Sequence, residues 1–257
     1  MKLTKSNYFS PEANKAYMSV SQFKSFSKCP ASALAEINGE YEREETTALL
    51  VGKYVDAYFD GTLEQFKQEH PEIFKKDGTL KAEYIQANQI IERIEKDPLT
   101  MEYLTGRKQV IMTGEICGVP VKIMMDVYKT GKRIVDRKIV KDFENIYDTE
   151  KGSIPFFEYW GYDLQGAVYQ EIVRQNTGLK LPFFLQAATK EKITDLDLIE
   201  IPQHTLDFQL EHFAANIERY DAIKKGIIEP DRCEQCDYCK LTKVLTAPKC
   251  SDDFYLI

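Results

Sequence analysis

The segment RIVDRKIV, residues 133–140, places an acidic and a basic side chain inside a run of Ile and Val. The branched apolar residues predict a strand, in which successive side chains point to opposite faces. Asp136 and Lys138 must then share one face, and Arg137 must point to the other. A buried carboxylate is unfavourable without a partner or a metal ion. The segment therefore predicts an inner strand that carries a polar site on one face.

Two further strands precede this segment and bring a second carboxylate toward it. Residues 108–116 and 119–128 are rich in Val, Ile and Met, and short turns separate them from each other and from the third segment. This pattern predicts an antiparallel meander. Asp126 closes the second strand, where hairpin pairing can place it beside Asp136 and Lys138.

Two carboxylates and one ammonium group on a single sheet face suit a hard divalent cation. Oxygen ligands bind Mg²⁺, and a neighbouring lysine can orient a water molecule and stabilise developing negative charge. This combination predicts hydrolysis of a phosphodiester bond. The alternative is an ordinary solvated hairpin face, because Asp-x-Lys pairs occur by chance on many strands.

The rest of the chain predicts an α/β fold with a central mixed sheet flanked by helices. The first hundred residues are mostly helical in pattern, as in residues 80–96, where apolar side chains form one stripe and charges lie opposite. After the meander, we expect a helix over residues 159–177, strands over 182–189 and 196–201, and a closing helix over 206–223. We divide the chain into a mobile or loosely docked arm at 1–17, a main domain at 18–225 and a cysteine-bearing tail at 226–257.

Composition limits the nucleic-acid contacts and the location of the protein. The chain has 34 Lys and Arg against 41 Asp and Glu, a formal net charge of −7, which argues against a generally adhesive surface for phosphates. No apolar run approaches the ~18 residues of a membrane span, and the first residues lack an apolar export segment, so we expect a cytoplasmic protein. A local basic surface is compatible with the net charge. Its candidates are Arg107, Lys108, Lys129, Lys132, Arg133, Arg137, Lys138 and Lys141, most of which are equally explained as solvated residues near the turn. Tyr159, Trp160 or Tyr162 is either packed in the core or stacked on a base.

Three cysteines stand at regular spacing in the tail, Cys233, Cys236 and Cys239. Thiols in the cytosol stay reduced, so metal binding explains them better than disulfides do. Thiolates at this spacing can surround one soft metal. The fourth ligand is open between Cys250 and a distant cysteine.

The motifs together resemble a known nuclease superfamily. Asp126 followed by Val135-Asp136-Arg137-Lys138 resembles the core of the PD-(D/E)XK nucleases. The segment Gln165-Gly166-Ala167-Val168-Tyr169 resembles the Q-x-x-x-Y element of the RecB-like branch, and its Gln and Tyr share a helix face. Gly52-Lys53-Tyr54-Val55-Asp56 occupies the place of the G-x-x-x-H element. The resemblance extends over residues 18–240 and is strongest to phage and prophage exonucleases of the exodeoxyribonuclease VIII (RecE-like) group.

This resemblance implies a restriction-endonuclease-like core and a role for each matching residue. Asp126 and Asp136 would bind Mg²⁺ or Mn²⁺, together with the carbonyl of Ile139, and Lys138 would be the catalytic lysine. Gln165 and Tyr169 would steady the site and the scissile strand. Asp56 replaces the histidine of the family, so it is open whether it binds the metal or is a solvated helix residue. Glu115 is a further acidic candidate, with an exposed strand position as its alternative.

The resemblance also implies a substrate and partners. Such an exonuclease would act on linear double-stranded DNA, expose one strand for a single-strand annealing protein in phage recombination, and form a homo-oligomer, without a membrane partner. Two alternatives stay open, a non-catalytic nucleic-acid-binding module and an adaptor organised by the cysteine metal.

For the cysteines, the resemblance implies an iron–sulfur centre. Several RecB-like nucleases hold a [4Fe-4S] cluster with one cysteine before the nuclease core and three after it. The segment SFSKCP, residues 25–30, resembles their leading Cys-Pro segment, so the implied ligands are Cys29, Cys233, Cys236 and Cys239. The last two cysteines of those relatives usually stand further apart. A Zn²⁺ site with Cys250 in place of Cys29, and unligated thiols, stay open as alternatives.

Overall fold

A five-stranded mixed sheet forms the centre of the molecule. The computed structural model describes residues 1–248, 250 and 251. The sheet order is β1 (Arg107–Ile116), β2 (Val119–Lys129), β3 (Arg133–Val140), β6 (Phe183–Thr189) and β7 (Leu196–Glu200). β3 and β6 are parallel and the other neighbours are antiparallel. The predicted meander of the first three strands is confirmed.

Parallel neighbours need a crossover connection, and the crossover between β3 and β6 contains α9 (Tyr162–Thr177). It also contains a short hairpin, β4 (Ile146–Asp148) and β5 (Gly152–Ile154), followed by α8 (Phe156–Tyr159). The sequence did not predict β4 and β5, because strands of three residues are too short to show an alternating pattern.

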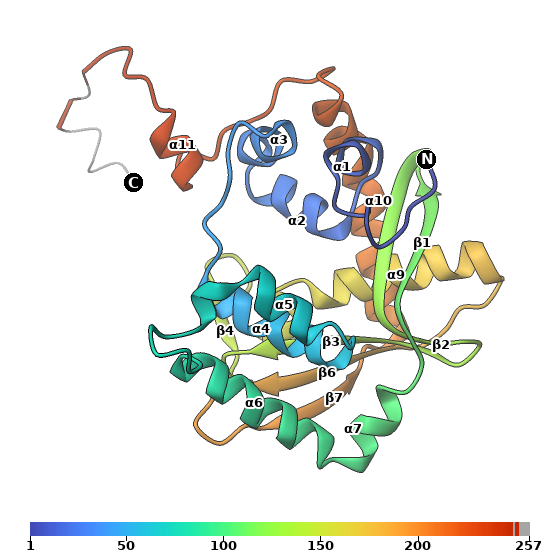
Figure 1. Cartoon of the computed structure of the whole chain (residues 1–257). Coiled ribbons are helices and arrows are strands. Elements are labelled where there is room, and N and C mark those ends of the chain that lie inside the picture. The colour runs from blue at the N-terminus through green and yellow to red at the C-terminus, as the bar shows by residue number, and fades with distance from the viewer. Residues whose placement is uncertain (249, 252–257) are drawn as a thin grey trace.

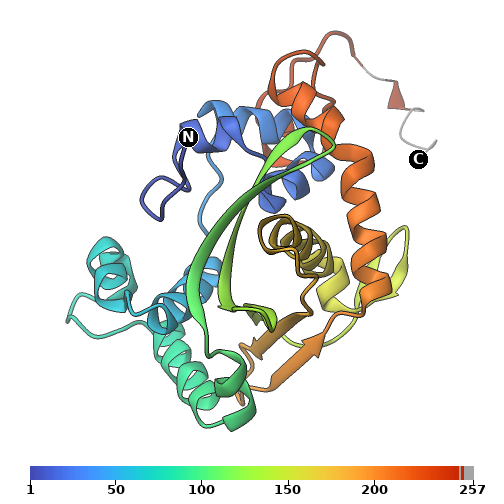
Figure 2. The same cartoon turned by 90° about the vertical axis from the view of Figure 1, so that its right-hand side faces the viewer.

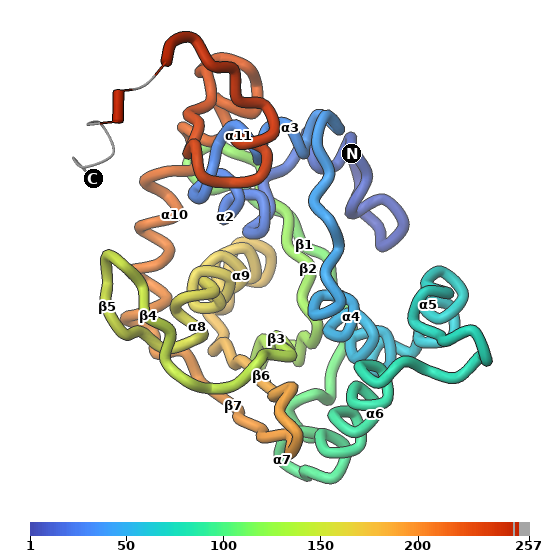
Figure 3. Tube along the Cα trace, turned by 90° about the vertical axis from the view of Figure 1, so that its left-hand side faces the viewer, coloured from blue at the N-terminus to red at the C-terminus, as the bar shows by residue number. Residues whose placement is uncertain are grey.

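The helices cover both faces of the sheet, so the predicted α/β class is confirmed. α9 lies inside the curve of β1 and β2, with α10 beyond it, and the group α4 to α7 covers the opposite face (Figures 2 and 3). The N-terminal helices lie above the sheet beside α10 (Figure 1). The remaining bounds are α1 (Pro11–Ala16), α2 (Val20–Lys28), α3 (Pro30–Asn38), α4 (Thr47–Phe59), α5 (Leu63–Glu69), η1 (Pro71–Ile73), α6 (Ala82–Glu95), α7 (Pro98–Tyr103), α10 (Gln203–Lys224) and α11 (Asp237–Leu241).

A separate hydrophobic core lies on each face of β3. Ile134 packs with residues of α9 and α10, whereas Val135 packs with residues of α4 and α6. The alternation of side chains then places Asp136 on the α9 side and Arg137 on the α4 side. The sheet is thus buried on both faces. A charged residue in β3 is therefore unfavourable unless a specific partner offsets the cost of burying its charge.

The N-terminal arm is held against β2 by a buried lysine. Lys122 is 1% exposed, and its Nζ donates hydrogen bonds to the Tyr8 carbonyl (2.5 Å) and to Asn14 Oδ1 (2.7 Å). Met18 adds a parallel bridge to Val121. The sequence predicted a mobile or loosely docked arm, whereas the structure shows it docked. Lys122 gives no such signal in the sequence, because a lysine in a strand is ordinarily exposed.

Candidate functional site

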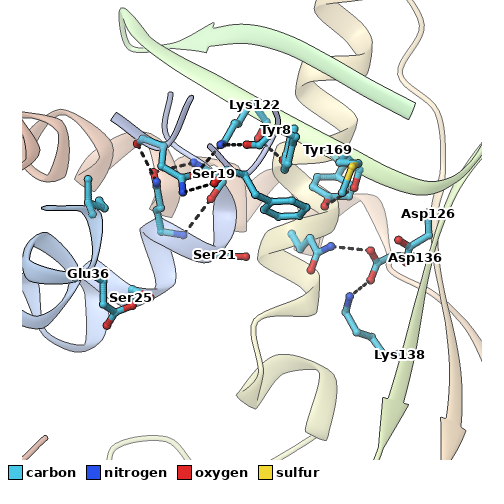
Figure 4. Close-up of a pocket in the computed structure, with 17 residues that line it drawn as sticks. Tyr8, Ser19, Ser21, Ser25, Glu36, Lys122, Asp126, Asp136, Lys138 and Tyr169 are labelled. Atoms are coloured by element: carbon cyan, nitrogen blue, oxygen red, sulfur yellow. Dashed lines mark hydrogen bonds and ion pairs between the residues drawn. The ribbon is translucent and has the colours of Figure 1, made fainter. Parts of the chain in front are cut away.

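The site forms where β2 and β3 separate. Their pairing extends from Lys129 opposite Arg133 to Val127 opposite Val135. The next residues, Asp126 and Asp136, therefore lie beside each other just past the paired segment. Both line a cavity of about 520 Å³, as does Lys138. Figure 4 shows these three side chains together, with Tyr169 of α9 beside them. Gln165 of α9 also lines the cavity.

Asp136 is the most enclosed carboxylate of this group, at 2% exposed. One of its oxygens, Oδ1, accepts a hydrogen bond from Gln165 Nε2 at 2.7 Å. The other, Oδ2, forms an ion pair with Lys138 Nζ at 2.6 Å. Burial raises the pKa of Asp136, although the Lys138 charge opposes this. Burial disfavours the charged form of Lys138, but the carboxylates of Asp136 and Asp126 outweigh it, so its pKa is raised and the ammonium form persists.

Asp126 is fixed by the backbone of β3. Its Oδ2 accepts a hydrogen bond from the Arg137 N–H at 2.9 Å, and its Oδ1 accepts one from Gln109 Nε2 at 3.4 Å. Within a strand, the N–H and C=O of one residue point the same way. The carbonyl of Arg137 therefore points toward Asp126, and the carbonyl of Ile139, two residues on, points to the same side. The sequence did not single out the Arg137 carbonyl.

Arg137 points to the opposite face, as predicted from the strand alternation. It is 2% exposed, and its guanidinium lies 4.6 Å from the ring centroid of Phe59. Its Nε donates to Asp56 Oδ1 at 2.9 Å. Arg137 therefore belongs to the interior, and the expectation that it forms part of a DNA-contacting surface is wrong.

Asp56 has this arginine as its partner and does not line the cavity that holds Asp126 and Asp136. Burial raises the pKa of Asp56, and the Arg137 charge opposes the change. Among the described residues, the four cysteines discussed below are the only group of three or more potential ligands gathered closely enough for one ion. A metal-binding role for Asp56 therefore stays a prediction.

Gln165 and Tyr169 lie one turn apart on α9, as their spacing predicted. The Tyr169 hydroxyl donates to the Met124 carbonyl at 3.0 Å, which anchors α9 to β2 beside Asp126. Between them, Gly166 allows α9 to approach β6 closely. A Cβ atom at Gly166 would lie 2.5 Å from Cδ1 of Phe183, a fully buried ring.

Gly166→Ala is expected to destabilise the fold by roughly 1–3 kcal/mol, because an added methyl group in a packed core forces side chains and backbone to shift. The helix preference of Ala over Gly recovers only about 1 kcal/mol of this cost. Urea denaturation measures the change in the free energy of unfolding. Gly52→Ala in α4 is the matched control, because nothing lies within 4 Å of its Cβ position. We expect the control to gain up to about 1 kcal/mol, and equal behaviour of the two variants would contradict the packing argument.

Most of the other candidates from the sequence lie away from the cavity. Glu115 is exposed on β1 and does not line the cavity. Arg133 stacks on Tyr103 at 4.0 Å and pairs with Glu102, so it supports α7. Of the eight basic candidates, Lys138 alone lines the cavity. The predicted basic cluster around the β2–β3 turn is therefore not part of the cavity wall.

A lysine that the sequence did not single out lies close to the site. The Nζ atoms of Lys24 and Lys138 both lie over the Tyr162 ring, 5.6 and 5.3 Å from its centroid. Burial, together with the neighbouring Lys138 charge, lowers the pKa of Lys24 to about 8. Ser19 caps α2, and Lys24 and Lys28 stand four residues apart within this helix. Residues at that spacing share a helix face, so the sequence could have identified this basic face of α2.

The tail cysteines form a second candidate site. The Sγ atoms of Cys29, Cys233, Cys236 and Cys239 all lie within 4.8 Å of one another. Cys29 is 3.6 Å from Cys239, and Cys233 is 3.9 Å from Cys239. Cys250 is exposed and outside this group, so the structure assembles the predicted quartet with Cys29. Backbone N–H groups of Gln235 and Cys236 lower the pKa of Cys233 to about 6, which favours its thiolate. Burial raises the pKa of Cys29 and of Cys236.

These distances fit one tetrahedral ion. Four thiolates at about 2.3 Å from a zinc ion place neighbouring sulfurs about 3.8 Å apart. A [4Fe-4S] cluster inserts iron and sulfide atoms between the thiolates and so needs a wider arrangement. The side chains present therefore fit a single soft ion better than a cluster.

Residues 19–242 match the model of a protein family described as "PDDEXK-like domain of unknown function (DUF3799)". The match covers most of the chain, including Asp126, Asp136, Lys138 and the tail cysteines up to Cys239. The chain belongs to this family. It is therefore a member of the PD-(D/E)XK-like group, and the sequence-based assignment to that superfamily is confirmed.

Solved structures include a similar protein of the same length class. A crystal structure described as a "Putative exonuclease" from Eubacterium rectale is 48% identical in sequence, with a TM-score of 0.96 over 99% of this chain and 98% of that chain. A second structure, SSO0001, is 10% identical over 78% of this chain and 87% of that chain, and its TM-score of 0.29 supports no argument. None of the curated proteins matches the chain. Among the described residues, no helix is long and apolar enough to cross a membrane.

Proposed function

We propose that the protein is a metal-dependent deoxyribonuclease. The observation that carries the proposal is the convergence of Asp126, Asp136 and Lys138 on one cavity, at the point where β2 and β3 separate. Membership of the PDDEXK-like family supports it. The 48% identical structure described as a "Putative exonuclease" supports it further.

In this proposal, each residue of the cavity has a separate task. Asp126 and Asp136, with a strand carbonyl from Ile139 or Arg137, would hold Mg²⁺ or Mn²⁺, which supplies charge neutralisation and a more acidic bound water. Lys138 holds its proton, orients the attacking water and stabilises the charge that develops on the phosphate. Gln165 fixes the rotamer of Asp136 through its 2.7 Å hydrogen bond, and Tyr169 fixes α9 on β2.

We further propose the finer assignment to phage-type recombination exonucleases of the RecE-like group. Such an enzyme digests linear double-stranded DNA from an end and passes the exposed strand to a single-strand annealing protein. The sequence resemblance and the name of the Eubacterium rectale protein support this assignment. Homo-oligomerisation belongs to the same proposal and rests on the resemblance alone.

A non-catalytic DNA-binding module is the second candidate. The observation that favours it is the position of Asp56, which is paired with Arg137 in place of lining the cavity where the family has a histidine. A metal-organised adaptor is the third, because the cysteine quartet forms a complete site of its own.

For the quartet, we propose one Zn²⁺ ion held by Cys29, Cys233, Cys236 and Cys239. The 3.6 and 3.9 Å sulfur distances support a single ion over the [4Fe-4S] cluster that the resemblance implied.

Linear and covalently closed circular duplex DNA, incubated with the protein and Mg²⁺ or Mn²⁺, separate these functions. We expect digestion of the linear form alone, and EDTA should stop it. Cutting of the circle would replace the exonuclease proposal with an endonuclease. Binding without cutting of either form would favour the non-catalytic module, and neither binding nor cutting would favour the adaptor.

A further inference from the structure

A second cavity, of about 630 Å³, lies beside the catalytic one. The two cavities share Ser21 and Ser25 of α2 in their walls, so they lie on either side of this helix. The residues that line the second cavity come from α2, the chain before α4, the α8 region, and the adjacent parts of α9 and α10. We call it the Trp160 groove and define it by Lys24, Lys28, Arg43, Lys151, Tyr159 and Trp160.

The groove combines positive charge with exposed aromatic rings. Trp160 is 45% exposed and Tyr159 is 41% exposed, and their rings meet edge to face at 5.0 Å. Lys28 Nζ lies 5.8 Å from the Trp160 ring centroid. Large aromatic side chains are ordinarily placed where they can bury their rings, so two half-exposed rings beside lysines indicate a surface that a ligand completes.

The acidic residues of the groove do not cancel this charge. Glu158 pairs with Lys151 at 3.6 Å, and Asp163 is buried, where it accepts hydrogen bonds from the Leu164 N–H and from Gln209. Arg43 pairs with Glu36 through its Nε only. In the described part of the chain, Lys28 has no carboxylate within ion-pair distance and is exposed. The groove is therefore a local basic surface on a chain whose net charge is −7.

Lys24 links the groove to the catalytic lysine. Its Nζ donates to the Trp160 carbonyl at 3.1 Å and lies over the Tyr162 ring. Lys138 lies over the same ring from the catalytic side. One aromatic ring thus separates the groove from the proposed cleavage centre, a separation that a strand of nucleic acid spans within a few nucleotides.

We propose that the Trp160 groove binds the single strand adjacent to the scissile phosphate, with an unpaired base stacked on Trp160 and backbone phosphates held by Lys24, Lys28 and Arg43. Alternating phosphates and base faces are what a basic groove with aromatic rings recognises in a single strand. This inference rests on the proposed nuclease function and names the part of the substrate that the groove holds.

Trp160 is the only tryptophan of the chain, so its fluorescence reports on this groove alone. The protein is titrated with a ten-nucleotide oligothymidylate in the absence of Mg²⁺ and Mn²⁺, which prevents cleavage and leaves the proposed zinc site loaded. We expect saturable quenching of the fluorescence, with an affinity that falls as salt rises. Unchanged fluorescence at saturating oligonucleotide, with binding detected by a labelled oligonucleotide, would overturn the proposal. An equal response to an acidic peptide would overturn it in favour of a protein partner.

Variants test the two kinds of contact separately. Trp160→Ala is expected to weaken binding of a fluorescein-labelled oligonucleotide by roughly 5- to 150-fold, the range of one lost base stack, and Trp160→Phe should restore most of the affinity.

The double variant Lys28→Ala with Arg43→Ala tests the phosphate contacts. It should reduce the slope of log affinity against log salt concentration by about 1.4, from two lost phosphate contacts at about 0.7 each. Lys129→Ala with Lys132→Ala, in the β2–β3 turn outside both cavities, is the matched control and should bind as the wild type does. Loss in the control equal to that in the groove variant would overturn the assignment.

The outcome separates this inference from the proposed function. Cleavage of DNA without a Trp160 response would refute the groove and leave the nuclease intact. A Trp160 response without cleavage under Mg²⁺ or Mn²⁺ would refute the nuclease and support the groove as a nucleic-acid site.

Discussion

Asp136→Asn and Lys138→Ala are each expected to lower the rate of DNA cleavage by roughly 10²–10⁴-fold, the range for losing a charged group that acts on the reacting phosphate. Asp136→Asn keeps the shape of the side chain and the acceptor for Gln165, but it removes the negative charge. Lys138→Ala removes the ammonium group that lies 2.6 Å from Asp136. Single-turnover cleavage of end-labelled linear duplex measures the effect.

Asp136→Asn should change stability and DNA affinity much less than the rate, whereas Lys138→Ala also leaves the buried Asp136 without its ion-pair partner. Lys138 is about a quarter exposed, so it can turn toward solvent when Asp136 loses its charge. The matched controls are Lys141→Ala, a 90% exposed lysine just past β3, and Glu115→Gln, an exposed carboxylate on β1. Both controls should cleave within about twofold of wild type, because neither acts on the phosphate. If Asp136→Asn or Lys138→Ala cleaved at the wild-type rate, the site assignment would be wrong.

Cys239→Ser is expected to lower the free energy of unfolding by about 3–5 kcal/mol, in the upper range of single-residue effects, because it removes one ligand of the proposed structural metal site. In a chain of this length, the change corresponds to a melting temperature lower by roughly 6–20 °C. Cys239 is fully buried and lies within 4 Å of two other thiols, so all four ligands are disrupted together. Thermal unfolding monitored by circular dichroism measures the shift.

The metal and its ligands can be checked separately. Cys117→Ser is the control, since this exposed cysteine stands in the β1–β2 turn outside the quartet, and its melting temperature should not change. Elemental analysis of anaerobically purified protein should find one zinc per chain. Iron and acid-labile sulfide in place of zinc would support the [4Fe-4S] cluster. If neither metal is found and Cys239→Ser has the melting temperature of the wild type, the thiols are unligated. A shift in Cys250→Ser as large as in Cys239→Ser would restore Cys250 as the fourth ligand.

The sequence predicted those features that depend on the spacing of neighbouring residues, such as strand alternation and the apolar stripes of helices. The alternation in residues 133–140 placed Asp136 and Lys138 on one face and Arg137 on the other, and the structure agrees. The helices and the larger strands follow from apolar spacing for the same reason. The pairing of Cys29 with the tail came from the family resemblance, since no local rule joins residues so distant in the chain.

The unpredicted features depend on contacts between distant segments. Lys122 and Arg137 are buried because partners from α1 and α4 meet them, and nothing beside them in the sequence announces those partners. The basic residues near the β3 motif predicted a basic surface at the β2–β3 turn. In the structure, the basic surface near the cavity is formed by the lysines of α2. Lysines one helical turn apart in α2 are close in space to the site only after the chain has folded around α9.

The position of Cys29 in the sequence determines when the cysteine quartet can form during synthesis of the chain. Cys239, whose thiol lies 3.6 Å from that of Cys29, follows 210 positions later, so the cysteine quartet can form only after residue 239 has been synthesised. Cys29 immediately follows α2, whose lysines line the Trp160 groove. A nascent chain that has already completed its sheet therefore still lacks the proposed metal site next to α2.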